Sequence, residues 1–229
     1  MRKLSDLWAS FLYRLFSHHE IEAFRNLLAE RTISRNHRRG KKTVQREGFA
    51  RPTRLNLGCG EILKEGFLNV DMIPAGDVTV DLRRQLPFES GCCELIFSEH
   101  CFEHFDYPSE IGGLLRECFR ILKPGGELRF SVPDTEWPLG DYFHGMDAPY
   151  FRACKENHWH PADYTTRIEH INYHFRQSGE HRFAYDFETA VKLLETVGFV
   201  MISRRDFDPT LDSAHRKVGS LFMSAFKPK

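Results

Sequence analysis

The chain has 229 residues, of which 41% are hydrophobic and 13% aromatic, a composition that excludes a disordered tail and fits one domain with or without an appendage. Its 32 lysines and arginines balance 32 acidic residues, so the protein as a whole is not a polycation, which argues against a nucleic-acid partner. No run approaches the roughly 20 apolar residues of a membrane span.

The six cysteines include no C-x-x-C pair, and Cys92 and Cys93 are adjacent. This pattern is neither a disulfide framework nor a thiolate zinc site. Reduced cysteines are typical of a cytoplasmic protein, which is the location we expect.

The first 50 residues differ in charge from the rest of the chain. They hold 11 lysines and arginines against 5 acidic residues, a net charge of +6, which leaves −6 for the remainder. Apolar residues at helical spacing predict an amphipathic helix over residues 4–16, and the polar, basic residues 35–47 predict a linker. The helix packs on the domain, which we favour, or makes a peripheral contact with the inner face of a membrane. We therefore divide the chain into a helix and basic linker, residues 1–50, and a domain, residues 51–229.

The domain alternates strands and helices. Alternating or continuous apolar runs predict strands at 54–58, 67–71, 77–81, 94–98, 127–132, 199–205 and 220–226. One helix is predicted from Ser109 to Leu122, and a second has Asp186 as its N-cap and Gly198 as its C-terminal stop. This alternation indicates an α/β domain with a mostly parallel sheet. Residues 134–181 read as an irregular insert rich in histidine and aromatic residues.

The first connections of the domain are short. Only residues 59–66 separate the first two strands, and residues 72–76 follow the second, whereas a parallel crossover normally needs a dozen or more residues. Five extended residues span about 17 Å, enough to run back along the sheet without a helix. We therefore expect one face of this half of the sheet to be poorly covered, or covered by the N-terminal helix.

Glycines and acids follow the first three strands. Gly58 and Gly60 end the first strand, where glycine permits a turn and close approach of a ligand to the backbone. Asp71 ends the second strand, where a carboxylate can accept hydrogen bonds from a ribose diol. Asp81 ends the third strand and is followed by Leu82, a pair that suits an adenine ring. The dinucleotide fingerprint G-x-G-x-x-G is absent because Leu63 takes its third position, so the set predicts an adenosine ligand without a pyrophosphate.

Four segments carry a family resemblance. They are "LNLGCGEILKEGFLNVDMIP", "VDLRRQLPF", "ELIFSEHCFEHF" and "LRECFRILKPGGELRFSVPD". In order and spacing they resemble the class I S-adenosylmethionine-dependent methyltransferases, and specifically the methyltransferase-11-like branch often found with polysaccharide biosynthesis. The resemblance implies a Rossmann-like seven-stranded sheet, mostly parallel with an antiparallel last strand. The short first crossovers are normal for this branch.

The resemblance also implies how S-adenosylmethionine would bind. Its methionine end would lie against Gly58, Cys59 and Gly60, beside Asn56, which stands where many methyltransferases carry an acid. Its ribose and adenine would contact four residues, Asp71, Met72, Asp81 and Leu82. Ser98, at the end of the fourth strand, would lie near the sulfonium.

The residues after the fourth strand are candidates for catalysis. His100 and His104 stand where methyl transfer would occur, and histidine is the natural base near neutral pH. In the alternative interpretation, Glu103 and His104 only hold the loop. A third interpretation uses the resemblance of H-x-x-E-H to the metal-binding E-x-x-E-H of small-RNA 2′-O-methyltransferases, although we assign no metal here. The spacings of His158 with His160 and of His170 with His174 are compatible with a metal but are weak signals.

Three functions remain open from the sequence. The first, which we favour, is O-methylation of a saccharide or glycolipid precursor held by the aromatic insert, although the same aromatic residues could merely pack a lid. The second is methylation of RNA or protein with the help of the basic arm. The third is a non-catalytic S-adenosylmethionine-binding module. The sequence does not indicate the oligomeric state.

Overall fold

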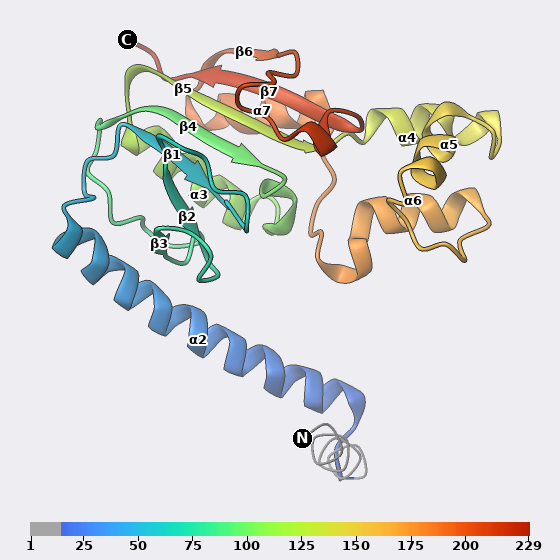
Figure 1. Cartoon of the computed structure of the whole chain (residues 1–229), viewed down its shortest axis with the longest axis horizontal. Helices are drawn as coiled ribbons and strands as arrows, with labels where there is room; N and C mark the ends of the chain where they lie inside the picture. The colour runs from blue at the N-terminus through green and yellow to red at the C-terminus, as the bar shows by residue number, and fades with distance from the viewer. Residues whose placement is uncertain (1–14) are drawn as a thin grey trace.

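A seven-stranded mixed sheet forms the centre of the molecule in the computed structural model, which describes residues 15–229 (Figure 1). The strands lie in the order β3-β2-β1-β4-β5-β7-β6. Their bounds are β1 Arg54–Leu57, β2 Leu68–Asp71, β3 Val78–Thr79, β4 Cys93–Glu99, β5 Leu122–Pro133, β6 Val200–Arg204 and β7 Ser220–Phe226. The first five strands are parallel, and β7 is antiparallel to both β5 and β6. This confirms the predicted fold class.

Six α-helices are described around this sheet. They are α2 His18–Glu47, α3 Ser109–Ile121, α4 Glu136–Asp141, α5 Pro149–Glu156, α6 Arg167–Arg176 and α7 Phe187–Val197. Short 3₁₀ turns lie at η1 Phe102–His104, η2 Tyr142–His144, η3 Gln177–Gly179 and η4 Ala214–Arg216. No described helix is both long and apolar enough to cross a bilayer.

The two predicted domain helices form as expected. The apolar face of α3 is buried against the sheet, and its residues are Ile111, Gly112, Leu114, Leu115, Cys118 and Ile121. At the start of α7, the side chain of Asp186 accepts a hydrogen bond from the backbone N–H of Thr189, and Gly198 ends the helix with a φ of +106°. Both ends of α7 are therefore set by local sequence.

The short connections after β1 and β2 contain no helix, as predicted. On this side of the sheet α2 packs against β3. Gly40 lies at the contact, where an added Cβ would stand 2.1 Å from the carbonyl oxygen of Thr79. His37 and Val44 are the other buried residues of the helix. A helix therefore contacts this part of the sheet, but it is α2. The N-terminal helix that the sequence predicts at residues 4–16 lies almost wholly outside the described residues.

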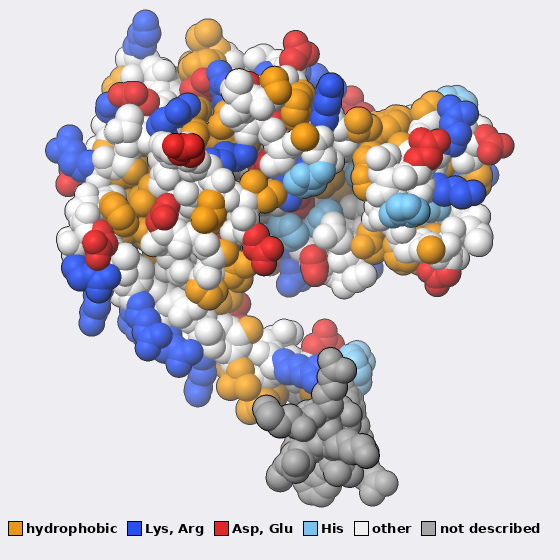
Figure 2. All heavy atoms as spheres, viewed as in Figure 1, with side chains coloured by type: hydrophobic (Ala, Val, Ile, Leu, Met, Phe, Trp, Pro, Cys, Tyr) orange, Lys and Arg blue, Asp and Glu red, His pale blue; other side chains and the backbone are white. Residues whose placement is uncertain are grey.

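The predicted linker at residues 35–47 is wrong, because these residues form the C-terminal part of α2. The helix begins with a capping box between Ser17 and Glu20 and ends at Gly48, whose φ is +74°. Lysine, arginine and glutamine are good helix formers, so a polar, basic run need not be a loop once one side of it packs on a strand. Figure 2 shows the basic side chains lined up along this helix.

The insert at residues 134–181 is helical rather than irregular. It holds α4, α5 and α6, which stand beyond the end of β5 as a separate group (Figure 1). A second small core joins them, consisting of Ala148, Tyr150, Phe151, Cys154 and Ile171. Each helix is short and rich in residues that also suit loops, so the sequence alone gives little periodic signal.

Candidate functional site

A cavity of about 430 Å³ lies at the carboxyl edge of β1, β2 and β4. We call it the first cavity. Seven of the nine residues predicted to bind a cofactor line it, namely Asn56, Gly58, Cys59, Gly60, Asp71, Met72 and Leu82. The register explains this, because Leu57 pairs with Val70 and the turn after β1 therefore faces the end of β2.

The glycine turn is held by Asp71. The backbone N–H of Gly60 donates to one carboxylate oxygen at 2.7 Å, and that of Ile73 donates to the other at 3.0 Å. Gly58 has a φ of +68°, and a Cβ there would lie 2.1 Å from the Sγ of Cys101, so glycine is required. Gly60 has a φ of +49° and open space where a Cβ would point, which leaves its backbone accessible to a ligand.

An amide network orders the loop beside this turn. The buried side chain of Asn56 donates to the Oδ1 of Asn69 at 2.9 Å and to the carbonyl oxygen of Ile62 at 3.1 Å. Asn69 also accepts a hydrogen bond from the backbone N–H of Lys64 at 2.8 Å. Asn56 thus fixes the wall of the first cavity, a role that needs an amide because the side chain must donate.

Asp81 and Ser98 do not line the first cavity. The carboxylate of Asp81 accepts from the Nε of Arg83 at 2.9 Å and lies 3.2 Å from the Nε of Arg84. Burial works to raise the pKa of Asp81, but the hydrogen bonds from Arg83 outweigh it and hold the pKa below its usual value. The hydroxyl of Ser98 donates to the carbonyl oxygen of Leu57 at 3.0 Å and is buried between β1 and β4.

A second cavity of about 310 Å³ lies between the sheet and the insert. Figure 2 shows histidine side chains gathered in the hollow between these two parts of the molecule. Its wall from the insert includes Tyr150, Trp159, His160, Tyr173 and His174. Three residues line both cavities, namely His100, His104 and Arg216.

His100 stands at this junction in a constrained position. Its φ is +50°, and its backbone N–H donates to the carbonyl oxygen of Ser131 at 2.8 Å. The ring contacts the Oγ of Ser220 through Nε2 at 2.7 Å, and Nδ1 lies 3.7 Å from Oε1 of Glu103. Burial, reinforced by the charge of Arg216, lowers the pKa of His100 well below its usual value. The ring is therefore neutral near pH 7. The exposed His104 bonds the carbonyl oxygen of Glu180 through Nδ1 at 3.1 Å.

Glu103 is a buried carboxyl group whose two oxygens have no hydrogen-bond partner among the described residues. It is 1% exposed and lines the second cavity. Burial raises its pKa to about 8, so the group is mostly protonated at neutral pH. Glu103, His104 and His181 also offer ligand atoms within 4.8 Å of one another, a group that leaves out His100 of the H-x-x-E-H interpretation.

The sequence prediction missed Arg216 and Ser220. Arg216 donates to the carbonyl oxygen of Glu99 at 2.7 Å and reaches both cavities. Arg216 ends η4, just before β7, and Ser220 begins β7, where it pairs with Pro133 at the end of β5. The last strand was predicted to be antiparallel. Its first residue and the segment just before it therefore had to lie at the carboxyl edge of the parallel strands, and this expectation could have found both residues.

Comparisons with known proteins find a match to a methyltransferase domain over part of the chain. Residues 69–130 match a family model described as a methyltransferase domain. A stretch of 52 residues is 46% identical to malonyl-[acyl-carrier protein] O-methyltransferase 1 of Coxiella burnetii (strain RSA 493 / Nine Mile phase I). This stretch covers 22% of this chain and 17% of that protein.

Two solved structures resemble the chain at low identity. One is phosphoethanolamine N-methyltransferase 2 of Haemonchus contortus in complex with S-adenosyl-L-methionine, at 14% identity and a TM-score of 0.45, covering 77% of this chain and 48% of that one. The other is a SAM-dependent methyltransferase of Archaeoglobus fulgidus, at 16% identity and a TM-score of 0.46, covering 82% and 92%. The chain thus spans about half the length of the first of these proteins.

Proposed function

We propose that this chain, a class I S-adenosylmethionine-dependent methyltransferase, methylates a hydroxyl group of a saccharide or glycolipid precursor. The cofactor would occupy the first cavity and the acceptor the second. The observation that carries the proposal is that the two cavities adjoin at His100, His104 and Arg216. Direct transfer of a methyl group requires that the donor and the acceptor bind side by side, and adjoining cavities allow this.

The first cavity fits the cofactor. Its volume of about 430 Å³ lies within the usual range for small-molecule sites. Each carboxylate oxygen of Asp71 accepts one backbone N–H and keeps capacity for a ribose hydroxyl. Met72 and Leu82 provide apolar contacts for a flat ring. When bound, S-adenosylmethionine supplies a methyl group already activated by its sulfonium.

His100 is the proposed base. An alcohol acceptor must lose a proton as its oxygen gains the methyl group, and a neutral imidazole can take that proton. The pKa of His100 is lowered by burial, which keeps the ring in the accepting form. Its hydrogen bond with Ser220 fixes the ring at the boundary between the cavities. His104 is the second candidate, because it lines the same boundary but is exposed.

The second cavity favours a hydroxylated acceptor. Its insert side combines the aromatic faces of Tyr150, Trp159 and Tyr173 with the imidazoles of His160 and His174. Flat rings with polar edges can stack on a sugar and hydrogen-bond its hydroxyl groups. A cytoplasmic site of action is part of the proposal and agrees with the six free cysteines.

The test is transfer of a labelled methyl group from S-adenosylmethionine by the purified full chain to saccharide, glycolipid, RNA and protein fractions of a bacterial lysate. We expect label in a saccharide or glycolipid fraction. Label in RNA or protein would contradict the acceptor class and would direct attention to the basic face of α2. Binding of S-adenosylmethionine with no labelled product in any fraction would contradict methyl transfer.

A further inference from the structure

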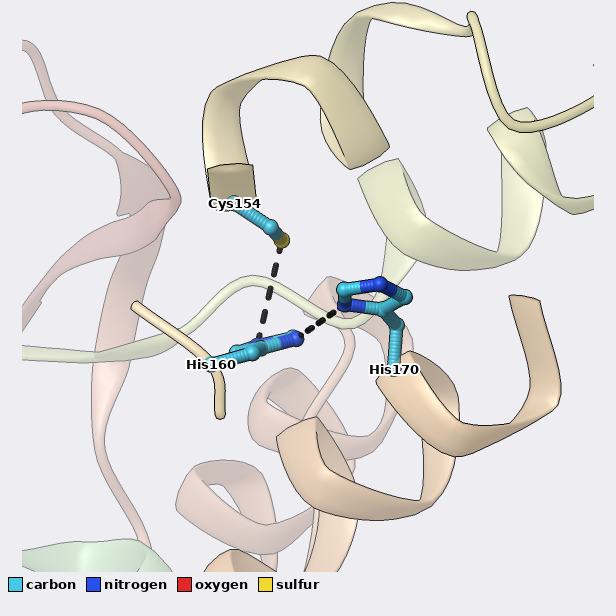
Figure 3. A group of neighbouring side chains, drawn as sticks. All are labelled: Cys154, His160 and His170. Atoms are coloured by element: carbon cyan, nitrogen blue, oxygen red, sulfur yellow. Dashed lines mark hydrogen bonds between the residues drawn. The ribbon is translucent and has the colours of Figure 1, made fainter. Parts of the chain in front are cut away.

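Cys154, His160 and His170 meet inside the insert, although they come from three segments. Cys154 lies on α5, His160 in the loop that follows, and His170 on α6. Figure 3 shows the three side chains pointing toward one another. The Sγ of Cys154 lies 3.8 Å from Nε2 of His160, and the Nδ1 atoms of the two histidines are 2.8 Å apart.

We propose that these three residues bind a zinc ion that holds the helices of the insert together, with water in the fourth position. With one ligand atom taken from each residue, the three atoms all lie within 4.8 Å of one another. Zinc holds sulfur and nitrogen ligands at about 2.0–2.3 Å, which puts tetrahedral neighbours roughly 3.3–3.8 Å apart. Small side-chain rotations would therefore complete the site.

The ligand types favour zinc over harder cations. One thiolate and two imidazoles suit zinc, whereas magnesium and calcium require oxygen ligands. Cys154 and His170 are buried and His160 is partly buried, so the site is shielded from bulk water. Binding would form a zinc–sulfur bond and break the S–H bond of Cys154, with release of the proton to the buffer.

The insert has a structural need for such a link. Its core consists of five buried residues joined by partly buried aromatic rings, and its helices have at most 10 residues. Small cores of this kind commonly depend on a metal or disulfide. All six cysteines are free in this structure, so no disulfide serves that purpose.

The site bears on the second cavity because His160 and its neighbour Tyr150 line that cavity. The hydroxyl of Tyr150 lies 3.5 Å from Nε2 of His160. A metal that fixes His160 would therefore also fix the wall formed by the insert. The inference does not rest on the proposed methyl transfer, and its test needs no acceptor.

The first experiment is metal analysis of the full chain purified without an affinity tag and dialysed against zinc and then metal-free buffer. We expect about one zinc per folded chain, and loss of the metal in Cys154→Ser and in His170→Ala. The matched controls Cys92→Ser and His158→Ala lie outside the cluster and should keep it. Glu103→Gln should also keep it, which separates this cluster from the group of Glu103, His104 and His181.

The second experiment replaces zinc with cobalt. A sulfur-to-cobalt charge-transfer absorption should appear in the wild type and be absent from Cys154→Ser. A chelator should lower the melting temperature of the wild type and leave that of Cys154→Ser unchanged. A folded wild type that takes up no zinc, a Cys154→Ser variant that keeps the metal, or loss of the metal in Glu103→Gln would overturn the proposal. Circular dichroism tests whether each variant is folded. If a variant is unfolded, the cobalt spectrum of the wild type alone tests the proposal, and the absence of the charge-transfer absorption overturns it.

Discussion

The carboxyl group of Glu103 makes the stability of this protein depend on pH. It is 1% exposed, and neither oxygen has a hydrogen-bond partner among the described residues. Burial raises its pKa from 4.5 to about 8, while the charge of Arg216 opposes the rise. Glutamine has nearly the same shape and cannot ionise. The substitution Glu103→Gln therefore removes the titration and preserves most of the packing.

The raised pKa of Glu103 determines how the stability changes with pH. The folded chain binds this proton more tightly than the unfolded chain, so the stabilisation is fully present below pH 4.5 and is lost as the pH rises through 8. Each unit of pKa difference corresponds to about 1.4 kcal/mol. The interval from 4.5 to about 8 gives a loss of roughly 3–5 kcal/mol in the free energy of unfolding, a large part of the stability of a domain.

The assay is urea unfolding of wild type and Glu103→Gln at about pH 5.5 and about pH 8.5. The difference in free energy of unfolding should move in favour of the variant by several kcal/mol between the two conditions. Glu65→Gln, at an exposed site, should show no such change. An equal difference between Glu103→Gln and wild type at both pH values would refute the reasoning, because the carboxyl would then be ionised in the folded state.

Three further perturbations test the proposed cofactor site, the contact of α2 with β3 and the proposed base. Asp71→Ala removes charge-assisted hydrogen bonds of about 1.5–3 kcal/mol each, so calorimetry should find S-adenosylhomocysteine bound at least tenfold more weakly, and equal affinity would contradict the site. Gly40→Ala places a Cβ 2.1 Å from the carbonyl oxygen of Thr79 and should cost roughly 1–3 kcal/mol in urea unfolding. Gly113→Ala, a helical position with nothing within 4 Å of the new Cβ, should not destabilise, and similar losses in both would refute the contact. His100→Asn, which tolerates the φ of +50°, should lower turnover roughly 10²–10⁴-fold with little change in cofactor affinity. Because the pKa of His100 is lowered, the wild-type rate should be flat through neutral pH and fall only in acid, whereas a rise near the imidazole's usual ~6.5 would place the base elsewhere.

The sequence alone determined the sheet and the glycine turn of the first cavity. Turn glycines and strand-end acids are local signals, and a rule of topology brings the ends of parallel strands to one edge. The sequence therefore predicts that Gly58, Gly60 and Asp71 lie together at that edge. The helix face of α3 and the caps of α7 were equally local.

Only the tertiary structure decided the conformation of residues 35–47 and the arrangement of the insert. The basic run at 35–47 is compatible with both linker and helix, and the close contact of Gly40 with β3 selects the helix. The insert has no strong period, so only its second core showed which of its side chains meet. Cys154, His160 and His170 are brought together by the packing of α5 against α6, because contacts between distant segments depend on the whole fold and leave no fixed spacing in the chain.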